Sequence, residues 1–142
     1  MVEIISNSEQ ETLAIAAGIA SKLQSGAILA LTGPLGSGKT AFAKGLAKGL
    51  EIKNKITSPT FVIYRTYPIP KRKTGKFYHF DFYRLKSVKN LRELGFLEIL
   101  NEPKNILAIE WAEKIRKQLP PRAIQVRFKR EKTPNTRKIT FS

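Results

Sequence analysis

The sequence contains no cysteine, a single histidine and a single tryptophan among its 142 residues. The absence of cysteine excludes disulfide bonds and thiolate metal sites, and one histidine cannot build a metal centre from several imidazoles. We expect this histidine, His79, to pack or to form a cap within a strand.

Long hydrophobic runs are also absent. No apolar segment approaches the roughly 20 residues that a helix needs to span a bilayer, and residues 1–5 lack the basic-then-apolar layout of a signal peptide. We therefore expect a cytoplasmic protein without a membrane segment. The length is sufficient for one hydrophobic core, so we expect a single domain over residues 1–142.

Acidic residues are scarce: 11 Asp and Glu face 26 Lys and Arg, which gives a net charge of +15. Such a charge attracts polyanions, and nucleic acid is the obvious candidate. Basic residues gather over 71–76 and over 116–138, where nine basic residues accompany only Glu131. Neither segment has the interleaved aromatics of a single-strand stacking platform, and a merely solvated basic surface explains the charge equally well.

One octapeptide carries a definite chemistry. Residues 33–40 read Gly-Pro-Leu-Gly-Ser-Gly-Lys-Thr and fit the phosphate-binding loop pattern at every fixed position. Its glycines let successive backbone N–H groups turn toward an anion. Lys39 would place its positive charge beside the β and γ phosphates, and Thr40 would offer its hydroxyl to Mg²⁺. The predicted nucleotide contacts are Gly33, Pro34, Leu35, Gly36, Ser37, Gly38, Lys39, Thr40 and, in the first helical turn, Ala41.

The flanking sequence supports this interpretation over a glycine-rich turn with an incidental lysine. Residues 27–31 are an apolar run typical of a buried strand, and residues 40–50 predict a helix whose N-terminus would point at the bound anion. The required order of strand, loop and helix is present, so the sequence predicts a nucleotide-binding protein.

The remaining patterns predict a P-loop NTPase-like α/β domain of three layers. A capping box at 8–11 precedes a helix that extends to about Leu23. We expect parallel central strands, antiparallel edge strands and a C-terminal β-hairpin. Further strands are predicted over 2–6, 61–67, 77–82, 106–109, 124–128 and 138–141, helices over 88–100 and 112–119, and loops over 68–76 and 132–135.

Two carboxylates stand where a phosphate loop needs them. Glu110 follows a buried strand, and ligands of open α/β sheets lie beyond the carboxyl ends of the strands. Asp81 ends another predicted strand, whose direction the sequence leaves open. Either residue would bind Mg²⁺ or position a water molecule, although an ordinary strand-end acid is the alternative for both.

Two further residues have open interpretations. Thr60 follows Ser58-Pro59 and could reach the γ-phosphate as switch segments do, but Ser-Pro-Thr is also a common turn. Trp111 either stacks near the nucleotide or fills the core.

Taken together, these segments resemble the bacterial TsaE (YjeE) family, the small ATPases of tRNA threonylcarbamoyladenosine biosynthesis. The resemblance covers nearly the whole chain. The motifs that carry it are the phosphate loop, Thr-Ser-Pro-Thr-Phe at 57–61, His-Phe-Asp-Phe-Tyr-Arg-Leu at 79–85, Glu-Leu-Gly at 93–95 and Ile-Glu-Trp-Ala-Glu at 109–113.

The resemblance implies an ATPase that uses ATP and Mg²⁺, is weak alone and is stimulated by its partners TsaB and TsaD. Together they would support repeated threonylcarbamoyl transfer to the adenosine beside the tRNA anticodon, with tRNA contacted directly or through the complex. The residue roles that it implies are catalysis for Lys39, Asp81, Glu110 and the switch-like Thr60, Mg²⁺ binding for Thr40, Glu110 and Asp81, and nucleotide contact for Trp111 and the adenine-proximal Thr12.

The chain also departs from the family. Pro34 stands where family members often have an acidic residue, which leaves the stiffness of the loop in question, and neither basic segment belongs to the motif set. Two other functions stay open on residues alone: a small-molecule kinase with the same loop, and a basic nucleic-acid-binding protein switched by nucleotide.

Overall fold

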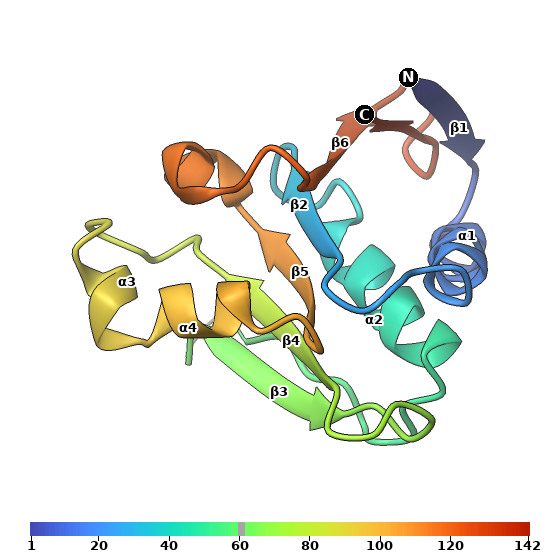
Figure 1. Cartoon of the computed structure of the whole chain (residues 1–142). Coiled ribbons are helices and arrows are strands. Elements are labelled where there is room, and N and C mark those ends of the chain that lie inside the picture. Colours follow the sequence, from blue (N-terminus) through green and yellow to red (C-terminus); the bar gives the residue numbers. More distant parts are fainter. Residues whose placement is uncertain (60–61) are drawn as a thin grey trace.

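The computed structural model describes residues 1–59 and 62–142. Within these residues, seven strands form one sheet in the order β1-β7-β6-β2-β5-β4-β3 (Figure 1). β2 pairs in parallel with β5 and β6, and β4 pairs in parallel with β5, whereas β3, β7 and β1 join antiparallel toward the edges. The strands are β1 (Val2–Ser6), β2 (Ile28–Thr32), β3 (Tyr64–Pro68), β4 (Lys76–Asp81), β5 (Ile106–Glu110), β6 (Ile124–Arg130) and β7 (Arg137–Phe141).

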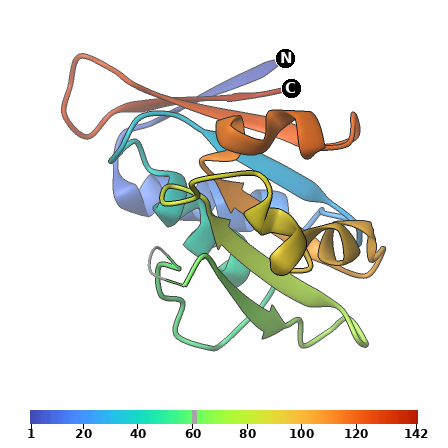
Figure 2. The ribbon, with the colours of Figure 1, turned by 90° about the vertical axis from the view of Figure 1, so that its left-hand side faces the viewer.

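Helices cover both faces of the sheet (Figures 1 and 2). On one face, α1 (Glu9–Ala20) and α2 (Lys39–Gly49) share a core cluster with inward residues of β2 and β6. On the other, α3 (Asn90–Glu93), α4 (Phe96–Asn101) and the 3₁₀ helix η1 (Ala112–Gln118) enclose an aromatic cluster around Phe80, Phe82 and Phe96. The predicted fold class, with its parallel centre, antiparallel edges and C-terminal hairpin, is confirmed. None of the helices described has the length and apolar character needed to cross a membrane.

Helix α1 begins and packs as its sequence dictates. Ser8 caps it by accepting the Glu11 backbone N–H at 3.0 Å, and the Glu11 carboxylate accepts from the Asn7 N–H at 2.7 Å. Glycines on α2 let the two helices approach closely. A Cβ at Gly45 would lie 2.5 Å from the Leu13 carbonyl oxygen, and one at Gly49 would lie 2.7 Å from the Ala20 Cβ.

The structure corrects several predicted boundaries. The first helix ends at Ala20 because Lys22 and Leu23 bond three residues back, to Ile19 and Ala20, and tighten the chain into a turn. Pro68 and Lys76 lie in strands rather than in the predicted loop.

Three other boundaries differ where the backbone leaves a regular conformation. Of the strand predicted over 61–67, residue 61 lies outside the described residues, and the strand begins at Tyr64, after Ile63, whose φ of 70° does not fit a strand. The helical segment over 88–100 divides at Gly95, which has a φ of 70°. Residues 112–118 form a 3₁₀ helix rather than an α-helix, with a non-helical backbone at Ile115.

This topology brings the carboxyl ends of β2, β4 and β5 together at one edge of the sheet. Because β4 and β5 are parallel and in register, Asp81 pairs with Glu110, and both stand at carboxyl ends beside the end of β2. The direction of Asp81's strand, open in the sequence, is thus settled.

Candidate functional site

The phosphate-loop segment joins β2 to α2 and is shaped by its glycines. Gly33, Gly36 and Gly38 have φ values of 145°, 71° and 105°, a region that side chains with a Cβ rarely adopt. Gly38 caps α2, so the N–H groups of the first turn of this helix are directed toward the loop. A Cβ at Gly33 would also lie 2.6 Å from the Phe128 carbonyl oxygen of β6. These glycines therefore serve both the loop conformation and its contact with the sheet.

A cavity of about 440 Å³ opens beside this loop. The start of α1, the loop and α2, the ends of β4 and β5, and the turn of the β6–β7 hairpin all contribute to its wall. Its lining residues are Ser8, Glu9, Thr12, Leu35, Gly36, Ser37, Gly38, Lys39, Thr40, Ala41, Asp81, Tyr83, Glu110, Trp111, Asn135 and Arg137.

Most of the predicted site residues meet at this cavity. Gly33 and Pro34 belong to the loop but do not line the cavity, and Thr60 lies outside the described residues. Sequence reasoning missed the contributions to the cavity of Ser8, Glu9, Tyr83, Asn135 and Arg137. The first two belong to the capping box at 8–11 and Tyr83 to the motif at 79–85, but neither pattern indicates a place in this cavity. Asn135 and Arg137 stand in no motif.

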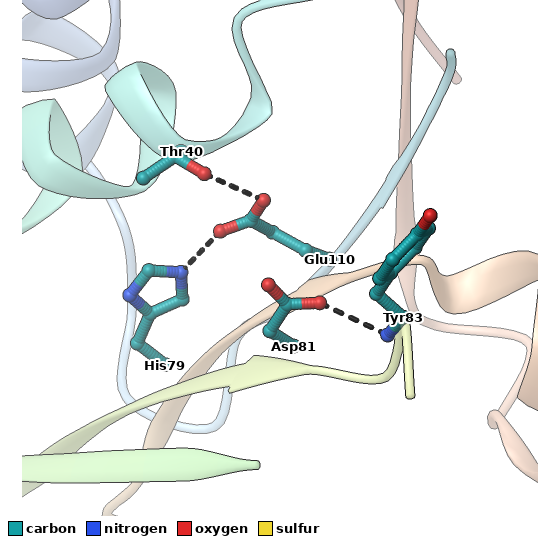
Figure 3. A network of polar contacts seen from close by, with 5 residues as sticks. All are labelled: Thr40, His79, Asp81, Tyr83 and Glu110. Atoms are coloured by element: carbon teal, nitrogen blue, oxygen red, sulfur yellow. Dashed lines mark hydrogen bonds and ion pairs between the residues drawn. The ribbon is translucent and has the colours of Figure 1, made fainter. Parts of the chain in front are cut away.

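Glu110 lies at the centre of a buried polar network (Figure 3). Its Oε1 accepts a hydrogen bond from Thr40 Oγ1 at 2.8 Å, and its Oε2 lies 2.5 Å from His79 Nε2. Only 3% of the Glu110 side chain and none of His79 is exposed. A carboxylate only accepts, so we assign the proton of this contact to His79 Nε2. The network connects the start of α2 to the ends of β4 and β5.

His79 is the functional residue that the sequence interpretation understated. It packs in a strand as expected, but it also holds the Glu110 carboxylate. A signal existed, because His79 and Asp81 are two residues apart and side chains at this spacing share one face of a strand. Its Nδ1 is buried and has no hydrogen-bond partner among the described residues.

The Asp81 carboxylate stands next to this network. Its Oδ1 accepts from the Tyr83 backbone N–H at 2.9 Å, which fixes the turn after β4. Only 5% of Asp81 is exposed. Its register pairing with Glu110 places two acids side by side at the cavity wall.

Lys39 is held inside the loop by polar and aromatic groups. Its Nζ donates to the carbonyl oxygens of Gly33 and Pro34 and lies 3.6 Å from the centroid of the Trp111 ring. Burial lowers the pKa of this ammonium from its ordinary value, while the carboxylates of Glu113, Glu110 and Asp81 act in the opposite sense. A phosphate oxygen would offer this desolvated cation a stronger partner than a neutral carbonyl.

Trp111 reaches the cavity through an unusual backbone conformation. Its φ of 58° and ψ of 39° are left-handed, which is uncommon for a residue with a large side chain. The ring lies 5.0 Å from that of Tyr83 and is only partly buried against the aromatic cluster. Trp111 therefore packs against the core and also lines the cavity, and its stacking near a nucleotide stays a prediction.

The residues at this edge fit Mg²⁺ that shares its coordination with a phosphate. No group of three His, Cys, Asp or Glu side chains suited to a metal occurs in residues 1–59 and 62–142. Thr40, Asp81 and Glu110 nevertheless bring one hydroxyl and two carboxylates to the same cavity. Mg²⁺ in nucleotide enzymes is characteristically held by one or two carboxylates together with substrate phosphates and water.

Comparison with known proteins identifies the family of this chain. The family model described as "Threonylcarbamoyl adenosine biosynthesis protein TsaE" matches residues 6–139. Relatives named tRNA threonylcarbamoyladenosine biosynthesis protein TsaE include that of Mycobacterium tuberculosis H37Rv, 34% identical over 94% of this chain and 82% of the relative. That of Rickettsia felis is 43% identical over 87% of this chain and 70% of the relative.

Among solved structures, the crystal structure of Bacillus subtilis YdiB superposes with a TM-score of 0.78 at 35% identity. The match covers 99% of this chain and 83% of YdiB. A family model over nearly the whole length, relatives above 30% identity and a shared three-dimensional structure lead to one conclusion: the chain belongs to the TsaE family.

Proposed function

We propose that this protein is a Mg²⁺-dependent ATPase that, with TsaB and TsaD, supports threonylcarbamoyl modification of the adenosine beside the tRNA anticodon. The observation that carries the ATPase proposal is the contact between Thr40 of the phosphate loop and the buried strand-end carboxylate of Glu110. The names of its relatives support the tRNA-modification role. The reaction would take place in the cytoplasm, as the sequence predicts.

Nucleotide binding follows from the loop. Backbone N–H groups of the glycine-rich segment and of the first turn of α2 would bind the phosphates, together with the dipole of the helix. Lys39 would exchange its carbonyl partners for phosphate oxygens. Thr12 of α1, whose Cγ2 would lie 3.9 Å from a Cβ at Gly38, is proposed to lie near the adenine.

Metal binding would fall to Thr40, Glu110 and Asp81. When bound there, Mg²⁺ would neutralise phosphate charge and polarise the phosphorus–oxygen bonds. Thr40 would turn its hydroxyl away from Glu110 to take up this role. His79 would keep the Glu110 carboxylate in place during the exchange, because its hydrogen bond reaches the other carboxylate oxygen.

In hydrolysis, a water oxygen would form a bond to the γ-phosphorus while the bond from this phosphorus to the β,γ-bridging oxygen breaks. The electron pair of that bond leaves with ADP, and the water protons end on the phosphate product or in solution. Glu110 is proposed to orient this water by accepting one of its protons in a hydrogen bond, with Asp81 as the second acidic group. Trp111 would shield the reacting phosphate, and Thr60 remains a switch-like candidate from the resemblance.

Reconstitution tests the proposal. Phosphate release should be slow for the protein alone and should rise markedly when TsaB, TsaD and tRNA are added together with ATP and Mg²⁺. Lys39→Ala is the control, because it removes the phosphate-binding ammonium and should abolish both rates. Equal phosphate release with and without the partners would refute the partner-stimulated ATPase, and omission of each component in turn identifies which one is required.

A further inference from the structure

The β6–β7 hairpin forms one support of the phosphate loop. The carbonyl oxygen of Phe128 in β6 approaches Gly33 so closely that a Cβ there would lie 2.6 Å away. Two residues further along β6, the guanidinium of Arg130 lies against Gly36. A Cβ at Gly36 would be 2.6 Å from Arg130 Nη2. Figure 2 shows the hairpin turn and the start of α2 at the same end of the molecule.

Two arginines at the end of this hairpin hold consecutive carbonyls of the loop. Arg130 and Arg137 are the last register pair before the turn. Arg130 Nη2 donates to the Leu35 carbonyl, and Arg137 Nη2 donates to the Gly36 carbonyl at 3.1 Å. Arg137 is itself fixed, because its Nη1 donates to the carbonyls of Pro134 at 2.5 Å and Thr136 at 3.1 Å.

These hydrogen bonds orient peptide planes. In a trans peptide the carbonyl and the following N–H point in opposite directions. When Arg130 holds the Leu35 carbonyl toward the hairpin, the Gly36 N–H is directed away from the hairpin, and Gly36 lines the cavity. The next plane is fixed at both ends, since Arg137 holds the Gly36 carbonyl and the Ser37 N–H bonds to the Pro34 carbonyl at 3.2 Å.

We propose that Arg130 and Arg137 are positioning residues that hold the phosphate loop in the conformation that receives a polyphosphate. The inference rests on the proposed nucleotide binding and adds the source of its preorganisation. A loop that is ordered before binding loses less conformational freedom when the ligand arrives, so its affinity is higher. The basic segment over 116–138, which the motif set left unexplained, thereby gains a role for two of its members.

The chain offers a matched control on the same hairpin. Lys129 and Lys138 form the adjacent register pair, and neighbouring residues of a strand point to opposite faces of the sheet. Lys129 is exposed, and Lys138 lies 3.8 Å from Glu131. Replacing either pair by glutamine removes the same charge from the same hairpin. A difference in affinity between the arginine variants and the lysine variants therefore reports contact with the loop rather than long-range electrostatics.

The test measures dissociation constants for ATP, ADP and inorganic tripolyphosphate by calorimetry, with Mg²⁺ present. We expect Arg130→Gln and Arg137→Gln each to raise the dissociation constants for ATP and ADP by about tenfold, the effect typical of one charge-assisted hydrogen bond. The dissociation constant for tripolyphosphate should rise by the same factor, because the arginines act on the phosphate loop and not on the nucleoside. Lys129→Gln and Lys138→Gln should stay within about twofold of the parent protein.

Two further measurements guard against indirect effects. Thermal unfolding of each variant without ligand checks that the hairpin is intact, and Arg130→Lys, which keeps the charge but not the forked donor, should bind with intermediate affinity. If the arginine variants bind tripolyphosphate with the same affinity as the lysine variants, the positioning role alone is overturned. A parent protein that binds no nucleotide at millimolar concentration would instead overturn the proposed function, so the two failures are distinguishable.

Discussion

The buried contact between His79 and Glu110 permits a quantitative test by a double-mutant cycle. The first variant is His79→Leu, the second is Glu110→Met, and the third combines them. Each single change leaves one polar partner buried without the other, whereas the double variant replaces both by apolar side chains of similar size. The two groups lie 2.5 Å apart and are 0% and 3% exposed, so solvent cannot replace the missing partner.

The expected magnitudes follow from this burial. Removing one partner leaves the other buried and without this hydrogen bond, which typically costs about 1–3 kcal/mol of the free energy of unfolding. The double variant leaves no carboxylate or imidazole to desolvate, and only the partly exposed Thr40 hydroxyl loses its acceptor. We therefore expect the double variant to be less destabilised than the two single effects added together, by about 2 kcal/mol.

Urea unfolding of the four proteins without nucleotide or Mg²⁺, followed by circular dichroism, gives the coupling free energy. Domains of this size are typically stable by roughly 5–15 kcal/mol, so each single variant should keep a measurable folded baseline. Additivity within about 0.5 kcal/mol would refute the reasoning, because residues without a direct interaction behave in that way.

Three other predictions follow from the site. Glu110→Gln, which keeps one acceptor oxygen, should retain nucleotide affinity in calorimetry while phosphate release falls by about a hundredfold; normal turnover would reject its assigned role. Asp81→Asn should raise the Mg²⁺ concentration needed for half-maximal phosphate release, and an unchanged metal titration would count against it. Because burial lowers the pKa of Lys39 in the free protein and phosphates favour its charged form, ATP binding should raise this pKa. ATP affinity should then be complete below the free-protein pKa and fall as the pH rises through it, with proton uptake in this range visible as buffer-dependent heats of binding; heats independent of the buffer would contradict this.

Local features of the site were predictable from the sequence because they depend on short spacings. The phosphate loop was identified from eight consecutive residues, and the strand before it and the helix after it have their own periodicity. Glu110 could be placed at a strand end because four apolar residues precede it. The same reasoning gave the sheet's parallel centre and the closing hairpin.

Features that depend on distant contacts were not predictable. The direction of β4 is fixed by its pairing with β5, and the partner of His79 stands 31 positions away in the chain. The hairpin arginines looked like members of a general basic cluster, because only the register of β6 and β7 brings them under a loop that is 95 and 101 positions distant. The left-handed backbone of Trp111 likewise has no signature in its own sequence.

The close contact of α1 with α2 has a consequence for the width of the cavity. Thr12 lies on α1 and Lys39 begins α2, and both line the cavity. Their relative placement depends on the contacts between the two helices, beside Thr12 at Gly38 and further along at Gly45 and Gly49. Gly45 is six residues, or about 9 Å of helix rise, from Lys39. A methyl group added at Gly45 would push the two helices apart at a point that does not line the cavity, and the cavity beside their first turns would widen. The width of the proposed nucleotide site would therefore depend on two glycines, Gly45 and Gly49, that do not line the cavity.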